Sequence, residues 1–245
     1  MKKLILISFL LITATTIFSW HMEIPIFTLL SLEQKSISTM PTIIASRIIS
    51  PDKNEYSSDS IVKDMDGNIY RTVRIGNQAW MTENLKTTTF NDGTPIEPIP
   101  YIGSNQMPST APPGFCWPQN DSLNKNTYGA LYNWFAVNTG KLAPNGWHIP
   151  SENDFRILIN YLGGESIAGQ KLNDIGFKAQ GAGQLGYMGT WEFNLFPDLD
   201  KYWTTTSGGW EPTDIKYVLL TRINPKVGWS SHPKDAAHSV RCIKN

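Results

Sequence analysis

The sequence lacks an excess of charge of either sign. Its 245 residues include 21 basic and 21 acidic side chains, which gives a formal net charge of zero. Domains that bind nucleic acids or anionic membranes usually carry a clear basic excess. The composition therefore predicts neither a nucleic-acid partner nor electrostatic attachment to a membrane.

A hydrophobic run of membrane-spanning length is also missing. The apolar N-terminal stretch, residues 4–18, is diluted by serine and threonine, whereas a bilayer-spanning helix needs about 20 mostly apolar residues. Lys2 and Lys3 precede this stretch, as in the charged start of a secretory signal peptide. We therefore expect residues 1–19 to be a cleaved signal peptide. The mature protein is expected to be exported to the periplasm, the cell surface or the medium, with no membrane span.

Cysteine is scarce: the sequence contains two, Cys116 and Cys242. Neither lies near the predicted signal peptide, so the lipid-modified cysteine of a bacterial lipoprotein is not expected. In an oxidising compartment an even pair favours a disulfide. Such a bond would close a long loop, with an entropic stabilisation on the order of 4–5 kcal/mol. Two unpaired, buried thiols are the alternative.

Motifs for catalysis or cofactor binding are few. No serine lies in a G-x-S-x-G elbow. Residues 181–186 spell G-x-G-x-x-G, but more glycine and Trp191 follow, instead of the helix that a dinucleotide site requires. His232 and His238 flank Asp235, yet their six-residue spacing fits neither helix nor strand ligand geometry. We predict no enzyme activity, no cofactor and no metal.

Residues 20–60 show no sustained hydrophobic period, and we expect an N-terminal extension or linker there. After it, three short alternating runs at 61–65, 69–75 and 78–81 are separated by Asp-Gly and Gly-Asn turn signals. This pattern predicts a meander of three strands. The acidic spacing at Asp64 faintly resembles a calcium loop, but a further acidic position and the closing Glu are missing.

Two helices are predicted in the middle of the chain. Tyr128, Leu131, Tyr132 and Phe135 recur at helical spacing, and Gly140 follows, so a first helix is expected from about 128 to 139. The second follows Trp147-His148-Ile149-Pro150. This segment predicts a short strand that ends at Pro150, because proline has no amide hydrogen for strand pairing. Ser151 and Asp154 then form a capping box for a helix that runs to Leu162.

The C-terminal third reads as strands. Three segments are rich in β-formers or alternate polar and apolar residues: 201–206, 215–223 and 238–243. Strands before and after two central helices, with long loops and no β-α-β alternation, indicate an α+β fold with antiparallel sheets. The predicted domain spans residues 61–245.

Five ordered blocks give the chain a family resemblance. They are Asp66-Gly67-Asn68 running to Asn84-Leu85, Tyr128-Gly129-x-Leu131-Tyr132-Asn133-Trp134, Pro144-x-Gly146-Trp147-His148-Ile149-Pro150-Ser151, Trp203-Thr204-Thr205-Thr206, and Ser239-Val240-Arg241-Cys242. Together they resemble the Fibrobacter succinogenes major paralogous domain, found in exported and surface proteins of gut and environmental bacteria. The resemblance implies a C-type-lectin-like fold related to the core of formylglycine-generating enzymes. Many members carry a cysteine where this chain has Ala143, which leaves Cys116 and Cys242 to pair with each other or not at all.

A glycan- or protein-binding module is the function that these features favour. Trp210 and Trp229 lie in predicted turns, and exposed tryptophans stack on sugars and are enriched in binding hot spots. With Glu211 they are the candidate ligand-binding residues, although burial of both rings as satellite core is an equal alternative. A structural or adhesin subunit that binds a partner through residues 20–60 is another alternative. A formylglycine-generating enzyme is disfavoured because that chemistry uses two neighbouring C-terminal cysteines.

Overall fold

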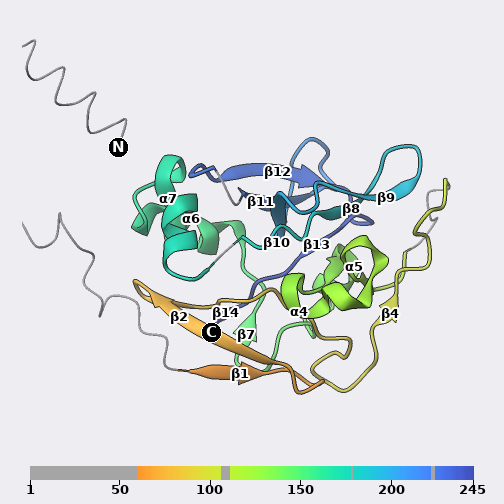
Figure 1. Cartoon of the computed structure of the whole chain (residues 1–245), viewed down its shortest axis with the longest axis horizontal. Coiled ribbons are helices and arrows are strands. Elements are labelled where there is room, and N and C mark those ends of the chain that lie inside the picture. Colours follow the sequence, from red (N-terminus) through yellow and green to blue (C-terminus); the bar gives the residue numbers. More distant parts are fainter. Residues whose placement is uncertain (1–59, 106–110, 178, 222–223) are drawn as a thin grey trace, which may run out of the picture. The chain divides into compact units, whose positions relative to one another are not determined.

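Strands dominate the part of the chain that the structure describes (Figure 1). The computed structural model describes residues 60–105, 111–177, 179–221 and 224–245, all within one compact unit. The predicted signal peptide and the predicted extension up to residue 59 lie outside these residues. Among the described residues, no helix combines the length and apolarity that crossing a bilayer requires.

The elements follow one another from a strand-rich start through short helices to a strand-rich end. In chain order they are β1 (Ile61–Lys63), β2 (Ile69–Ile75), β3 (Gln78–Met81), β4 (Glu97–Pro98), β5 (Gly114–Cys116), the 3-10 helices η1 (Pro118–Asn120) and η2 (Ser122–Asn124), α4 (Lys125–Tyr128), β6 (Leu131–Asn133), α5 (Trp134–Val137), β7 (Trp147–His148), α6 (Glu152–Tyr161), α7 (Glu165–Asp174), β8 (Gln184–Tyr187), β9 (Trp191–Asn194), β10 (Leu199–Ser207), β11 (Ile215–Thr221), β12 (Gly228–His232), β13 (Ala237–Ser239) and β14 (Ile243–Lys244).

These strands form two sheets. The smaller sheet has the order β1-β2-β3-β14-β7, and the larger has the order β12-β11-β10-β13-β6-β5-β4, with β8 pairing to β13 and β9 to β8. Among the named strands, β10–β13 and β4–β5 pair in parallel and the remaining pairs are antiparallel. Helix α6 packs on β10 and β11 and is followed by α7 (Figure 1). The predicted α+β class with mostly antiparallel sheets is confirmed.

The N-terminal meander forms as predicted, and its first turn is closed by hydrogen bonds within the protein. Both carboxylate oxygens of Asp64 accept hydrogen bonds from Asn68, and one also accepts the Tyr70 hydroxyl at 2.6 Å. Asp66 accepts the backbone N–H and the hydroxyl of Thr88. These carboxylates therefore stabilise a hairpin and its contact with a neighbouring loop.

The predicted helix at 128–139 is wrong. The segment instead contains the end of α4, strand β6 and the short helix α5. Gly129 has φ +76°, and a Cβ there would lie 2.6 Å from the side chain of Asn84. Strand β6 is then held between β5 and β13, so Leu131 and Tyr132 are buried as strand residues. Their spacing fits a helix, but pairing with distant strands decides the conformation.

Helix α6 begins and is capped as predicted. The Ser151 hydroxyl accepts the N–H of Asp154, and the Asp154 carboxylate accepts the N–H of Ser151. Phe155, Leu158 and Ile159 face the core beneath the helix. Helix α7 was not predicted from the sequence. It follows after Gly163 and Gly164 and adds Ala168 and Leu172 to the same core.

The glycine-rich segment at 181–186 binds a carboxylate of the protein itself. The backbone N–H groups of Gln180, Gly181 and Ala182 all point at the buried carboxylate of Asp200. Strand β8, not a helix, follows. This confirms that the G-x-G-x-x-G match is accidental.

The predicted C-terminal strand is two strands in two different sheets. β13 lies in the large sheet and β14 in the small one, and Val240, Arg241 and Cys242 connect them. The fully buried Arg241 donates hydrogen bonds to Asn84 and Tyr202, and to the carbonyl oxygens of Thr82 and Phe177. Asn84 in turn donates to Asp200 at 3.4 Å, so one polar network joins the sheets inside the core.

Candidate ligand-binding cleft

A cleft of about 480 Å³ lies between the first turns of α6, strands β11 and β12, and the loop before β11. Its lining combines two tryptophans with charged and hydroxyl side chains: Glu152, Arg156, Gly209, Trp210, Lys216, Trp229, Ser230 and Ser231. Small-molecule pockets typically have volumes of roughly 300–1,000 Å³ with a few placed polar groups. The cleft has the volume of a ligand site, with two tryptophans in an otherwise polar lining.

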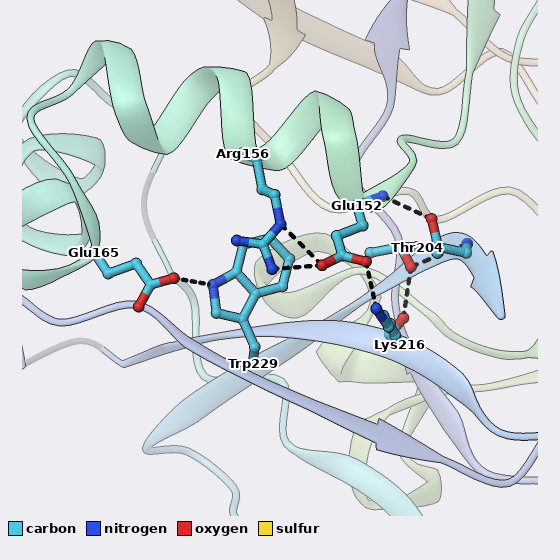
Figure 2. Close-up of polar contacts among 7 residues, drawn as sticks. Glu152, Arg156, Glu165, Thr204, Lys216 and Trp229 are labelled. Atoms are coloured by element: carbon cyan, nitrogen blue, oxygen red, sulfur yellow. Dashed lines mark hydrogen bonds and ion pairs between the residues drawn. The ribbon is translucent and has the colours of Figure 1, made fainter. Parts of the chain in front are cut away.

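Trp229 is fixed in this cleft from two sides (Figure 2). Its indole N–H donates to the carboxylate of Glu165, at the start of α7, over 2.7 Å. The guanidinium of Arg156 lies over the indole ring, 4.7 Å from the ring centroid. A cation at this distance from an aromatic face is attracted by the ring quadrupole. The ring therefore has a defined orientation before any ligand arrives.

Glu152 joins the two cations of the cleft. One of its oxygens accepts two hydrogen bonds from Arg156, and the other accepts the Lys216 ammonium at 2.7 Å. The hydrogen bond from Lys216 and that from Arg156 lower the pKa of Glu152, against an opposing effect of burial. Glu152 is therefore ionised at neutral pH and holds both cations in place (Figure 2).

Backbone and side-chain contacts position these three charges. The N–H of Glu152 donates to the Thr206 hydroxyl at 3.0 Å, which ties the start of α6 to β10. The Thr204 hydroxyl donates to the Lys216 carbonyl at 2.8 Å and ties β10 to β11. The charged side chains thus project from two elements whose relative position is fixed by hydrogen bonds.

Trp210 stands at the exposed rim of the cleft, and its side chain is 86% exposed. Its backbone N–H donates to the Ser231 hydroxyl at 3.1 Å, and that hydroxyl donates to the buried Asp214 at 3.1 Å. The preceding Gly209 has φ +157°, and a Cβ there would lie 2.0 Å from the Ser231 oxygen. Only glycine therefore allows the backbone to approach β12 this closely and present Trp210.

The residues that line this cleft lie within a segment of the chain that matches a known protein family. Residues 73–244 match the Fibrobacter succinogenes major domain. The chain belongs to this family. No curated protein and no solved structure matches the chain. The matched region contains every residue that lines the cleft, and it starts within β2, later than the predicted domain boundary at residue 61.

In this Fibrobacter succinogenes major domain, two of the three predicted ligand-binding residues lie in the same cleft. Trp210 and Trp229 line the same cleft, whereas Glu211 is exposed and does not line it. Trp229 lies on strand β12, not in a turn as predicted. Glu152, Arg156 and Lys216 were not predicted as site residues from the sequence. The i, i+4 spacing of Glu152 and Arg156 was a visible signal for an ion pair, but their contact with Lys216 depends on tertiary structure.

The domain also brings together two histidines that are six positions apart. The rings of His232 and His238 lie 5.0 Å apart, and His238 packs on Trp203 and Tyr217. Burial, with Lys201 nearby, lowers the pKa of His232 to about 4 and that of His238 well below its ordinary value. Among the described residues, no group of three or more metal-ligating side chains could hold a metal ion. These rings pack as neutral aromatic side chains.

The disulfide expected between Cys116 and Cys242 does not form in the structure. Both are free, buried thiols. Cys116 ends β5 and packs with Leu131 and Trp191, whereas Cys242 belongs to a different core cluster around Trp203. Burial raises the pKa of Cys242 to about 12 and also raises that of Cys116. Both side chains contribute to the core as small apolar groups.

Proposed function

We propose that this domain is a non-catalytic binding module, exported to the periplasm, the cell surface or the medium, and that it binds a glycan in the cleft. The exposure of Trp210 carries the proposal. Among the described residues it is the most exposed large hydrophobic side chain, at the rim of a cleft that holds a second, fixed indole. Exposed aromatic surface of this kind is characteristic of interaction sites. Sugar rings present apolar C–H faces that such an indole covers.

The absence of catalysis in this proposal is supported by the state of the titratable groups. Glu152 is ion-paired in the cleft, and the two histidines with lowered pKa lie in the core, 5.0 Å from each other. A formylglycine-generating mechanism needs reactive thiols, whereas burial keeps Cys116 and Cys242 protonated and inaccessible.

The C-type-lectin-like fold belongs to the same proposal. The family resemblance supports this fold. The two mostly antiparallel sheets, with short helices and long connecting loops, support it as well. Export is supported by the predicted signal peptide at residues 1–19. A surface protein as the ligand of the cleft is the alternative, because tryptophan is also enriched at protein–protein hot spots. A structural or adhesin subunit that binds its partner through residues 20–60 is a further alternative.

The test is a glycan array combined with tryptophan fluorescence, run with and without calcium. We expect at least one glycan to bind and to shift the emission of the exposed indole. Trp210→Ala should abolish binding, whereas Leu123→Ala is the matched control, because Leu123 is 85% exposed and lies outside the cleft. If no glycan binds under either condition, the glycan proposal is wrong and the protein-binding alternative takes its place.

A further inference from the structure

We infer that the glycan of this cleft is acidic: a saccharide whose carboxylate or sulfate group is bound by Arg156 and Lys216 while a sugar ring stacks on Trp210. The inference rests on the proposed function and adds the charge of the ligand. It follows from which polar groups of the cleft are already engaged and which remain available.

The two cations keep several hydrogen-bond donors for a ligand. Two of the five N–H groups of Arg156 point to Glu152, which leaves three without a partner among the described residues. One of the three ammonium hydrogens of Lys216 points to Glu152, which leaves two. Both side chains are accessible, at 50% exposure for Arg156 and 36% for Lys216.

Two of the three side-chain acceptors in the cleft lining, Glu152 and Ser231, are engaged within the protein, whereas the Ser230 hydroxyl has no hydrogen bond among the described residues. Glu152 accepts from both cations and is only 15% exposed. The Ser231 hydroxyl accepts from the Trp210 N–H and donates to Asp214. Glu165, an exposed residue outside the lining, accepts the N–H of Trp229 through one carboxylate oxygen. The available donors of Arg156 and Lys216 therefore outnumber the available side-chain acceptor of the lining, the Ser230 hydroxyl.

The charge of the lining points the same way. Arg156 and Lys216 share the single carboxylate of Glu152, so one positive charge of the lining is uncompensated. Carboxylate and sulfate oxygens are the acceptors that best match such donors, and a guanidinium binds them with two parallel hydrogen bonds. A neutral sugar would supply hydroxyl groups that need acceptors as well as donors, and this lining offers few.

The saccharide part of the ligand follows from the tryptophans. The Trp229 ring has one face occupied by Arg156 and its N–H occupied by Glu165, so it shapes the floor of the cleft. Trp210 is held through its backbone N–H, and its ring makes no aromatic or cation–π contact among the described residues, so the ring surface is available to a ligand. The exposed indole and the cations line one cleft, which therefore fits a molecule with an apolar ring face and a nearby anionic group.

The experiment uses the full exported chain on an array in which each uronate- or sulfate-bearing glycan stands beside its neutral counterpart, the methyl ester or the desulfated form. We expect binding to the charged member of a pair and at least a tenfold weaker signal from the neutral one. The uronate and sulfate arms identify which anionic group is recognised. Arg156→Gln and Lys216→Gln should each weaken binding of the charged glycan about tenfold or more, as expected for a charge-assisted hydrogen bond.

Arg74→Gln is the matched control, because Arg74 is exposed on β2 and lies outside the cleft. It should leave binding unchanged. Equal binding to both members of a pair, or an equal loss in Arg74→Gln, would overturn the inference. If that binding still depends on Trp210, the proposed function stands. A complete lack of glycan binding overturns both.

Discussion

The guanidinium of Arg156 lies 4.7 Å from the centroid of the Trp229 ring, so α6 and β12 meet through a cation–π contact (Figure 2). The same ring donates its N–H to Glu165 at the start of α7. Trp229 therefore links one strand to two consecutive helices. Arg156 is half exposed, and ion pairs near the surface contribute only about 0–1 kcal/mol, so the main role of the Glu152–Arg156 pair is to orient the cation.

Replacement of Trp229 separates these two contacts. Trp229→Phe keeps an aromatic face and loses the N–H donor, so the free energy of unfolding should fall by about 0.5–1.5 kcal/mol. Trp229→Leu also removes the cation–π contact and should cost about 0.5–1 kcal/mol more. Urea denaturation measures both values. Equal stability of the two variants would show that the Arg156 contact contributes nothing.

Gly209→Ala should displace the rim of the cleft. The new Cβ would collide with the Ser231 hydroxyl, so we expect a loss of about 1–3 kcal/mol and weaker ligand binding. Gly189→Ala is the control, because Gly189 has φ +96° but open space around a Cβ. It should show the backbone strain without the collision and retain binding. Unchanged binding in Gly209→Ala would contradict the role assigned to this glycine.

Arg241→Met should be severely destabilising. The change leaves the Asn84 side chain and two carbonyl oxygens without their cationic partner inside the core, in a network that Asn84 extends to Asp200. Breaking a buried charge network costs about 3–5 kcal/mol. Arg74→Met, at an exposed position, should stay within about 0.5 kcal/mol of the parent protein. Thermal and chemical denaturation of both variants check the difference.

Acid should destabilise the domain through the buried histidine pair. The pKa values of His232 and His238 are lowered by burial and by the charge of Lys201, while Asp214 partly opposes this at His232. Near pH 6.5 and below, the unfolded chain therefore binds protons that the folded chain does not, and stability falls with falling pH. For His232 this loss continues down to about pH 4.

The measurement is urea denaturation between pH 5 and 8. This window stays above the range in which Glu152, with its lowered pKa, loses its charge. The double variant His232→Phe/His238→Phe should give a shallower slope of stability against pH, with each histidine responsible for up to about 1.4 kcal/mol per pH unit. An unchanged slope would exclude the pair as the cause.

Thiol labelling tests the state of Cys116 and Cys242. The native protein should react slowly, because both thiols are buried and their pKa values are raised. In denaturant without a reducing agent, both should react at once. Two unreactive positions in denaturant would indicate a disulfide and contradict the structure.

Local signals account for the parts of the fold that the sequence predicts well. Ser151 and Asp154 complete a cap within one turn, and the Asp66-Gly67 turn needs no distant partner to form. The segment after Gly129 is different, since Leu131 and Tyr132 form β6 only because β5 and β13 lie on either side. A helical spacing of apolar residues cannot distinguish these outcomes.

The candidate cleft could be predicted only in part, for the same reason. Trp210 and Trp229 were identified by residue type, which marks interaction surfaces in many proteins. Glu152 and Lys216 are ordinary charged residues in the sequence, 64 positions apart, and their contact depends on how α6 sits on β11. The pairing of His232 with His238 likewise depends on how β12 approaches β13.

The C-terminal strands β13 and β14 are each needed to complete a different sheet. β13 lies between β10 and β6 in one sheet, and β14 lies between β3 and β7 in the other. Both sheets therefore lack one of their interior strands until residues 237–244 are in place. Both sheets thus need residues 237–244 to be complete, and we expect a chain shortened before residue 237 to be degraded by proteases instead of forming a smaller folded domain.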